Sequence, residues 1–215
     1  MTATASNITV APIFMGIQRS DEELMVAFQG GDVKAYEELV RRHRHGVYNF
    51  IYRFLGNPET AEEVFQEVFI KIHKASAKYA PNGKFTTWLY TITRNQCVDT
   101  FRRNKIREAL SLETPTNGEE SRLGDRLESE NIPQDVLSSA HQIEAVLDEA
   151  LKRLNEDQRE VFLLREKHGF KFEEIASMTG VSVNTVKSRM RYALEGLRRT
   201  LKQSRYRELL EEKRL

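Results

Sequence analysis

Cysteine is almost absent from this sequence, which has a single one, Cys97, among 215 residues. One cysteine excludes an internal disulfide, and with no Cys/His cluster at ligand spacing it also excludes a cysteine-based zinc site. Nowhere do about 18 apolar residues follow one another, as a membrane-spanning helix requires. The first twenty residues lack the basic and apolar regions of a signal peptide. These absences predict a protein of the reducing cytoplasm without a membrane span.

An excess of one charge is also missing, because 33 Lys and Arg stand against 32 Asp and Glu. Any surface for a polyanion must therefore come from an uneven distribution of charge along the chain. Ser/His/Asp, P-loop and Gly-rich nucleotide motifs are absent, so the sequence predicts no enzyme, no cofactor and no metal. His43 and His45 are two positions apart on a predicted helix, where their side chains diverge, so we expect solvated residues there.

Apolar residues recur at helical spacing from Asp21 to about Arg107. A capping box at Ser20, with Glu23 three positions later, predicts where the first helix begins. The segment "GNPET" at Gly56 predicts a helix end followed by a new start. Four helices over residues 20–107 follow, after an N-terminal extension over residues 1–19. Their periodic residues include Leu24, Phe28, Leu39, Val47, Phe50, Phe54, Val64, Val68 and Ile72.

The character of the chain changes after residue 107. Eight acidic residues and two arginines lie between Glu108 and Asp135, without a sustained period, and this composition predicts a flexible acidic linker over residues 108–138. The helical pattern returns over residues 139–203, and a tail over residues 204–215 follows. The predicted fold is therefore all-α, with two small helical domains joined by the linker.

The segment "KFTTWLYTITRNQCVDTFRR" has the threonines and aromatics of a strand. However, the sequence offers no partner strand, and an isolated strand leaves its backbone hydrogen bonds unsatisfied. Phe85, Trp88 and Leu89 have helical spacing, so we predict a helix with these residues in the core. The other face then carries Thr87, Tyr90, Arg94 and Phe101, followed by a basic run that includes Arg102 and Arg103, and Cys97 is expected to be partly exposed.

The segment "FEEIASMTGVSVNTVKSRMRYALEGLRR" has the pattern of a helix-turn-helix. Ala176 allows close packing, Gly180 supplies a left-handed turn residue, and Ser182 caps the second helix. An amide, hydroxyls and guanidinium groups near the start of a helix suit major-groove recognition. The predicted DNA-facing residues are Ser182, Asn184, Thr185, Lys187, Ser188, Arg189, Arg191 and Tyr192.

The segment "AEEVFQEVFIKIHKA" separates into two faces when it is wound as a helix. Its outer ridge carries Glu63, Gln66, Glu67, Ile70 and Lys74. Carboxylates on such a ridge would repel phosphates, so the ridge suits a protein partner, and an ordinary solvated face is the alternative on these residues alone.

Taken together, "EVFQEVF", the aromatic helix, the acidic linker and "LNEDQREVFLLREKHGFKFEEIASMTGVSVNTVKSRMRYALEGLRR" resemble a bacterial RNA polymerase sigma factor of the extracytoplasmic-function group. The resemblance covers roughly residues 20–105 and 140–203 in the family's order. It implies a first domain that docks on the clamp helices of core polymerase and opens the minus-ten promoter element, and a second domain that binds the minus-thirty-five element as duplex. It also implies that an anti-sigma factor is a common partner.

The resemblance assigns roles to individual positions. It implies polymerase binding by Glu63, Gln66 and Glu67, to which we add the exposed Ile70. It places the melted minus-ten strand on the helix from Phe85 and on the loop before it; the expected contacts are Lys84, Thr87, Tyr90, Arg94, Arg102 and Arg103. In the second domain the resemblance implies that the minus-thirty-five element is read by Thr185, Lys187, Ser188, Arg189 and Arg191. The sequence departs from the family at Tyr192, where Arg is common.

Two other functions remain open on the sequence. The first is a self-sufficient helix-turn-helix regulator whose first domain senses a ligand or forms a dimer. The second is an interaction protein that sequesters another factor. A sensor requires a pocket in the first domain, whereas a docking subunit requires the exposed ridge at Glu63 and Gln66. Sequestration alone leaves the basic recognition helix unexplained.

Overall fold

The computed structural model describes residues 19–111 and 144–203, and within these ranges the regular structure is entirely helical. Residues 1–18 of the predicted extension, most of the predicted linker and the predicted tail lie outside the described residues. The first domain contains α1 (Asp21–Gln29), α2 (Val33–Leu55), α3 (Pro58–Ala75), the short 3-10 helix η1 (Ser76–Lys78) and α4 (Phe85–Ser111). The last helix thus extends four residues beyond residue 107, where the sequence predicted the linker to begin.

The second domain begins with a helix over residues 144–152. It continues with α6 (Glu156–Phe162), the π-helical turn η2 (Leu163–Lys167), α7 (Phe172–Thr179) and α8 (Val183–Gln203). Helices α7 and α8 form the expected helix-turn-helix, and Gly180 between them has the left-handed conformation, with φ of 70°. The cap at Ser182 is confirmed, because its hydroxyl accepts a hydrogen bond from the amide of Thr185 at 3.1 Å.

The predicted helix boundaries in the first domain are confirmed by their caps. Ser20 and Glu23 form a reciprocal capping box at the start of α1. Gly56 ends α2 in the left-handed conformation, and Asn57 then caps α3 through the amide of Thr60 at 2.8 Å. Pro58 occupies the first turn of α3, where its missing amide hydrogen costs no helical hydrogen bond.

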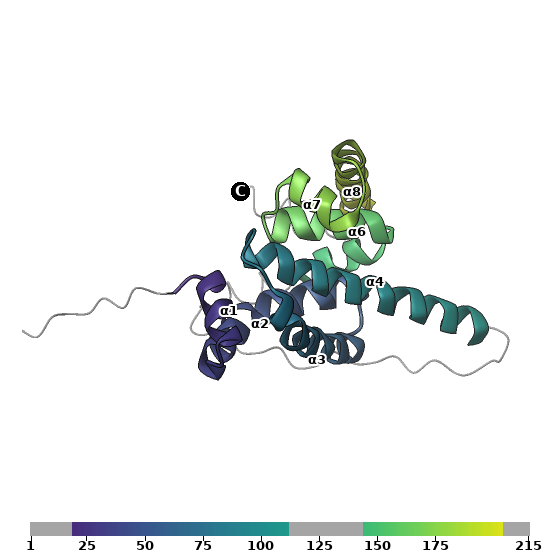
Figure 1. Ribbon diagram of the computed structural model, residues 1–215. Helices are drawn as coiled ribbons and strands as arrows, with labels where there is room; N and C mark the ends of the chain where they lie inside the picture. Colours follow the sequence, from purple (N-terminus) through teal and green to yellow (C-terminus); the bar gives the residue numbers. More distant parts are fainter. Residues whose placement is uncertain (1–18, 112–143, 204–215) are drawn as a thin grey trace, which may run out of the picture.

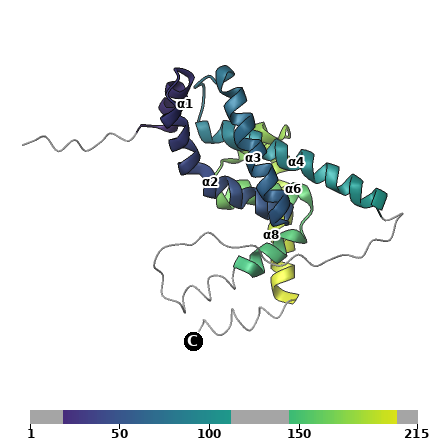
Figure 2. The ribbon, with the colours of Figure 1, turned by 90° about the horizontal axis from the view of Figure 1, so that it is seen from below.

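Helix α4 lies between the two domains. In Figure 1 it runs across the middle of the molecule, with α1 to α3 on one side and α6 to α8 on the other. Its C-terminal end projects beyond the other described helices in Figures 1 and 2. The buried apolar residues of both domains form one continuous cluster, which joins Phe50 and Leu89 of the first domain to Leu163 and Phe170 of the second.

None of the helices in the described ranges combines the length and apolar character that crossing a bilayer demands. In the same ranges no three Cys, His, Asp or Glu side chains gather closely enough to bind a metal ion.

Candidate functional site

The outer ridge of α3 has the exposure that the sequence predicted. Glu63, Gln66 and Glu67 are exposed, and the side chain of Ile70 is 53% exposed. Val64 and Val68, on the opposite face, are buried. An exposed isoleucine beside two carboxylates and an amide forms a small apolar spot inside a polar rim, which is the composition of a protein-binding surface.

Gln96 of α4, a buried residue for which we predicted no role, contacts the ridge from the side of the core. The Gln96 amide donates a hydrogen bond to the carboxylate of Glu67, and its carbonyl oxygen accepts one from the ammonium of Lys71. Gln96 therefore fixes two charged side chains on the exposed side of α3. The signal that the sequence holds for Gln96 is its helical spacing with Thr93 and Thr100, which places three polar residues on one side of α4.

The core face of α4 agrees with the prediction at Phe85 and Leu89, which are 2% and 0% exposed, and Trp88 is half-buried. The opposite face does not. Tyr90 was expected on an open surface, but it is only 5% exposed. The expectation of an open α4 face is therefore wrong, because helical periodicity shows which faces are apolar and not which polar face another domain covers.

Tyr90 packs against aromatic residues of the second domain. Its ring centroid lies 4.3 Å from that of His168 and 5.4 Å from that of Phe170. This burial raises the pKa of the Tyr90 phenol well above its usual value. Gly46 of α2 makes the packing possible, because a Cβ at this position would lie 2.8 Å from the Tyr90 hydroxyl oxygen.

Two cations of the predicted minus-ten surface are paired with acids of the second domain. Arg94 forms an ion pair with Glu160 of α6, whose side chain is 1% exposed. Burial raises the pKa of the Glu160 carboxyl, and the guanidinium of Arg94 opposes that rise. Lys84, in the loop before α4, lies 3.3 Å from Glu174 of α7. The sequence contained a signal for Glu160, because this acid shares the apolar helix face of Leu164.

The remaining minus-ten candidates are accessible. Arg102 and Arg103 are exposed on the projecting end of α4, and Thr87 is half-buried near its start. Arg103 also donates a hydrogen bond to the Thr100 hydroxyl at 3.0 Å. The structure thus divides the predicted minus-ten surface into an open basic end and a part that the second domain covers.

Two further expectations are wrong. Cys97 is fully buried, and burial raises the pKa of its thiol, so it is an unreactive core residue. His43 is not solvated, because its Nε2 lies 2.7 Å from the carboxylate of Asp21, which joins α2 to α1. This hydrogen bond is the main reason why the pKa of Asp21 lies below its usual value. His45 is exposed as expected.

The recognition helix α8 presents most of its predicted DNA-facing residues to solvent. Val186 and Met190 anchor the opposite side of the helix in the core. The guanidinium of Arg191 lies 4.9 Å from the ring centroid of Tyr192, so the two side chains form one stacked unit. The exposed residues are Ser182, Asn184, Thr185, Lys187, Ser188, Arg191 and Tyr192.

Arg189 is the exception on this helix. Its side chain is 22% exposed, and its guanidinium lies 2.6 Å from the carboxylate of Asp157. The expectation of a fully outward side chain is therefore too simple. Its contact with Asp157 holds the guanidinium on the side of α8 that carries the predicted DNA-facing residues.

A buried arginine that the sequence did not single out connects the two domains. Arg159 is 6% exposed and donates hydrogen bonds to the carbonyl oxygens of Leu151, Lys152 and Leu154 in its own domain and of Phe54 at the end of α2. It therefore satisfies terminal carbonyl groups of two helices. Burial lowers the pKa of its guanidinium.

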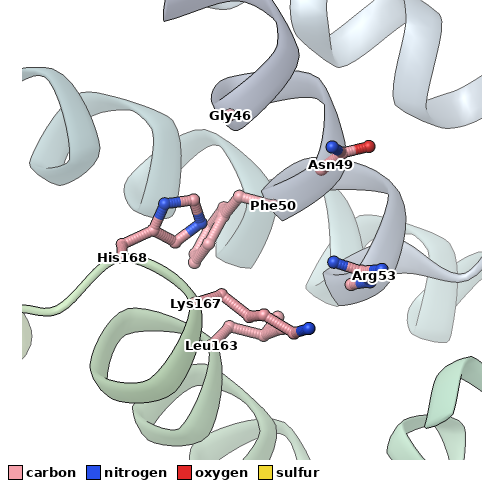
Figure 3. Close-up of a pocket in the computed structure, with 7 residues that line it drawn as sticks. All are labelled: Gly46, Asn49, Phe50, Arg53, Leu163, Lys167 and His168. Atoms are coloured by element: carbon pink, nitrogen blue, oxygen red, sulfur yellow. The ribbon is translucent and has the colours of Figure 1, made fainter. Parts of the chain in front are cut away.

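A cavity of about 190 Å³ lies at the contact between the domains. Figure 3 shows His168 beside Phe50, the side chain of Lys167 of η2 below them, and Arg53 of α2 to the right; all four residues line the cavity. Pockets for small-molecule ligands usually have about 300 to 1,000 Å³. This cavity is smaller and is shared by both domains, so it gives little support to a ligand-sensing first domain.

Comparison with known proteins places both domains in one family. The model of Sigma-70 region 2 matches residues 39–106, and the model of Sigma-70 region 4 matches residues 144–197. The chain is 30% identical over 183 residues to the ECF RNA polymerase sigma-E factor of Escherichia coli K12, which covers 85% of this chain and 95% of that protein. It is 29% identical over 189 residues to the RNA polymerase sigma-H factor of Pseudomonas aeruginosa, and the match covers 86% of this chain and 95% of that protein.

Solved structures show the same fold. CnrH, solved in complex with the cytosolic domain of CnrY, superposes with a TM-score of 0.63 at 22% identity, covering 86% of this chain and all of that one. The sigma factor RpoE of Bartonella quintana, solved with the anti-sigma factor NepR, gives a TM-score of 0.61 at 22% identity. This match covers 80% of this chain and 99% of that one. The two matched regions and the relatives along most of the chain show that it belongs to the extracytoplasmic-function group of RNA polymerase sigma factors, which direct promoter-specific transcription initiation.

Proposed function

We propose that this sigma factor docks on the clamp helices of core polymerase through the outer ridge of α3, which consists of Glu63, Gln66, Glu67 and Ile70. The support is the exposure of all four residues, together with the hydrogen bond by which Gln96 fixes Glu67. A pre-oriented carboxylate loses less side-chain entropy on binding than a free one.

The melted minus-ten strand is assigned to the face and the projecting end of α4. Lys84, Arg94, Arg102 and Arg103 supply cations for phosphates, Tyr90 supplies a ring for base stacking, and Thr87 supplies a hydroxyl. Stacking of a base on an aromatic side chain contributes about 1 to 3 kcal/mol. Because Tyr90 is buried here, this assignment requires the second domain to move away from α4.

The minus-thirty-five duplex is assigned to the DNA-facing residues of α8. The capped first turn at Ser182 places Asn184, Thr185 and Ser188 where base edges and phosphates of the major groove are within reach. Lys187, Arg189 and Arg191 add cations, and the Tyr192 ring beside Arg191 offers an apolar surface for a thymine methyl group.

One observation carries the proposal: a chain of the sigma family exposes an acidic and apolar ridge at Glu63 to Ile70 and a cationic helix start at Ser182 to Tyr192. The two surfaces have opposite electrostatic character, so one suits protein and the other suits DNA. Polymerase, by holding both domains, raises the effective concentration of the second promoter element after the first is bound.

Run-off transcription with purified core polymerase and a genomic promoter library tests the proposal. The wild-type chain should direct specific transcripts, and Q66A/E67A should lower its affinity for core polymerase about tenfold, which corresponds to about 1.4 kcal/mol. E37A, which removes an exposed acid from α2, serves as the control and should leave core affinity unchanged. An unaltered core affinity in Q66A/E67A would remove the docking assignment.

Two further elements belong to this proposal. The solved neighbours were captured with CnrY and with the anti-sigma factor NepR, and we expect an anti-sigma factor to bind this chain as well. The chain is assigned no reaction of its own, because it acts as a specificity subunit. It works in the cytoplasm, where polymerase and promoter DNA are found.

A further inference from the structure

The cavity between α2 and η2 has a cationic lining that the proposed function does not use. Its lining residues come from both domains: Gly46, Asn49, Phe50, Arg53, Leu163, Lys167 and His168. None of these described residues is acidic, and three of them carry basic side chains. Figure 3 shows the side chain of Lys167 extending from η2 towards the side of the cavity where Arg53 lies. Two cations that share one small cavity repel each other, so an anion between them would lower the electrostatic energy.

Arg53 and its neighbours have hydrogen-bond donors for such an anion. The guanidinium of Arg53 carries five N–H groups, of which the bonds to Asp148 at 2.9 Å and to Glu144 at 3.5 Å use two. Lys167 is exposed, and among the described residues no carboxylate forms an ion pair with it. The side-chain amide of Asn49 can donate as well. The cavity therefore combines donors of three kinds, a guanidinium, an ammonium and an amide.

The positive charge of these groups reaches the wall of the cavity. His168 lies in that wall, with its ring centroid 5.6 Å from that of Phe50. The pKa of His168 is lowered from 6.5 to about 4, mainly by burial, and Arg53 and Lys167 lower it further. A cation lowers the pKa of an imidazole only where its field is not fully neutralised. The acids beside Arg53 therefore do not cancel its charge at this wall.

We propose that this cavity binds a phosphate group, held by Arg53 and Asn49 of α2 and by Lys167 of η2. Guanidinium and ammonium groups are the usual partners of phosphate oxygens, and their hydrogen bonds to phosphate are charge-assisted. The cavity volume of about 190 Å³ is several times the roughly 30 Å³ of one water molecule, so the cavity admits a compact tetrahedral anion. Inorganic phosphate and the terminal phosphate of a nucleotide share this chemistry. The site is separate from the docking ridge and from α8, and it does not rest on the proposed function.

Titration of the full chain with sodium phosphate at constant ionic strength, followed by NMR of the histidine rings, tests the inference. At pH 7.5 the His168 signals should shift and reach saturation. The dissociation constant should be on the order of 1 mM, because so small an ion forms only a few bonds. The signals of His73, which is exposed on α3, should not move. A bound anion favours the imidazolium, so the pKa of His168 should also rise from about 4 when phosphate is present.

Three variants at exposed positions, each of which should fold, locate the site. K167Q removes one cation and should weaken phosphate binding about tenfold, because one charge-assisted hydrogen bond is lost. N49D keeps the shape of the side chain and adds a carboxylate to the lining, so repulsion should weaken binding at least about tenfold. K34Q is the control, because Lys34 lies at the other end of α2. It should match the wild type within about twofold, since salt screens so distant a charge.

The same titration with GDP distinguishes the two sources of the phosphate group. Tighter binding of GDP than of phosphate, sensitive to K167Q and N49D, would identify a nucleotide as the ligand, and equal or weaker binding would identify inorganic phosphate. A wild type without a saturable shift would overturn the inference, and so would wild-type affinity in both K167Q and N49D. Core binding and transcription test the sigma assignment separately, so neither of these results bears on it.

Discussion

The guanidinium of Arg189 in α8 lies 2.6 Å from the carboxylate of Asp157 in the first turn of α6. The Asp157 side chain is 51% exposed, so water and salt screen the pair and it contributes at most about 1 kcal/mol to stability. A promoter phosphate can therefore replace the carboxylate at little cost. The pair holds Arg189 on the side of α8 for which we propose DNA contact.

Replacing Arg189 with Ala should weaken binding of the holoenzyme to promoter DNA by about 1 to 3 kcal/mol and lower the salt slope of log K by about one. R198A, which removes an exposed cation further along α8, should leave both quantities nearly unchanged. Fluorescence anisotropy at four salt concentrations measures affinity and slope together. A slope in R189A equal to that of the wild type would mean that Arg189 contacts neither phosphate nor base.

Much of the fold could be predicted because its signals are local. The capping box at Ser20, the break at Gly56 and the turn at Gly180 each depend on residues within one helical turn, and all three are confirmed. Helical periodicity also placed Phe85 and Leu89 in the core, since burial in a single domain follows the apolar stripe of each helix.

The contact between the domains could not be predicted, because its partners are far apart in sequence and several of them are polar. Arg94 and Glu160 are 66 positions apart, and neither residue alone signals the other. Tyr90 and Cys97 were expected to be accessible because the α4 face that carries them holds threonines and an arginine. Burial of such a face depends on another domain, on which helical periodicity carries no information.

Replacing Gln96 with Leu should weaken binding to core polymerase through loss of orientation at Glu67. The amide hydrogen bond is lost while the volume of the side chain is kept, so we expect a loss of about 1 kcal/mol in core affinity. A double-mutant cycle with E67A measures the coupling, which should be of similar size. Additive effects of Q96L and E67A would show that Gln96 serves only the stability of the first domain.

Replacing Gly46 with Ala should destabilise the chain, although alanine is the better helix former by about 1 kcal/mol. The new Cβ would lie 2.8 Å from the hydroxyl oxygen of Tyr90, which is confined by His168 and Phe170. Thermal unfolding of G46A should occur several degrees below that of the wild type.

The double variant G46A/Y90F is the matched test of this clash, because it removes the hydroxyl and keeps the ring. Its melting temperature should return to that of Y90F or exceed it, since the helix propensity of alanine is then gained without the clash. Equal destabilisation by G46A in the wild-type and Y90F backgrounds would locate the strain elsewhere.

The imidazole of His168 should make the folded chain less stable in acid. Burial, and to a smaller extent Arg53 and Lys167, lowers its pKa from 6.5 to about 4. Between these values the unfolded chain binds more protons at this site than the folded chain, so stability falls as the pH decreases from about 6.5 towards 4. Glu160, whose pKa is raised by burial, acts in the opposite direction over part of the same range.

Comparison of the wild type with H168Q isolates the histidine, because Glu160 is common to both chains. Urea unfolding at pH 7.5 and pH 5.5 should show that the wild type loses about 1 kcal/mol more than H168Q, since the lower pH lies one unit below the ordinary pKa of histidine. The phenol of Tyr90, whose pKa is raised by burial, does not titrate in this interval and cannot produce the difference. An equal loss in both chains would show that the folded protein accepts the proton on His168 without cost.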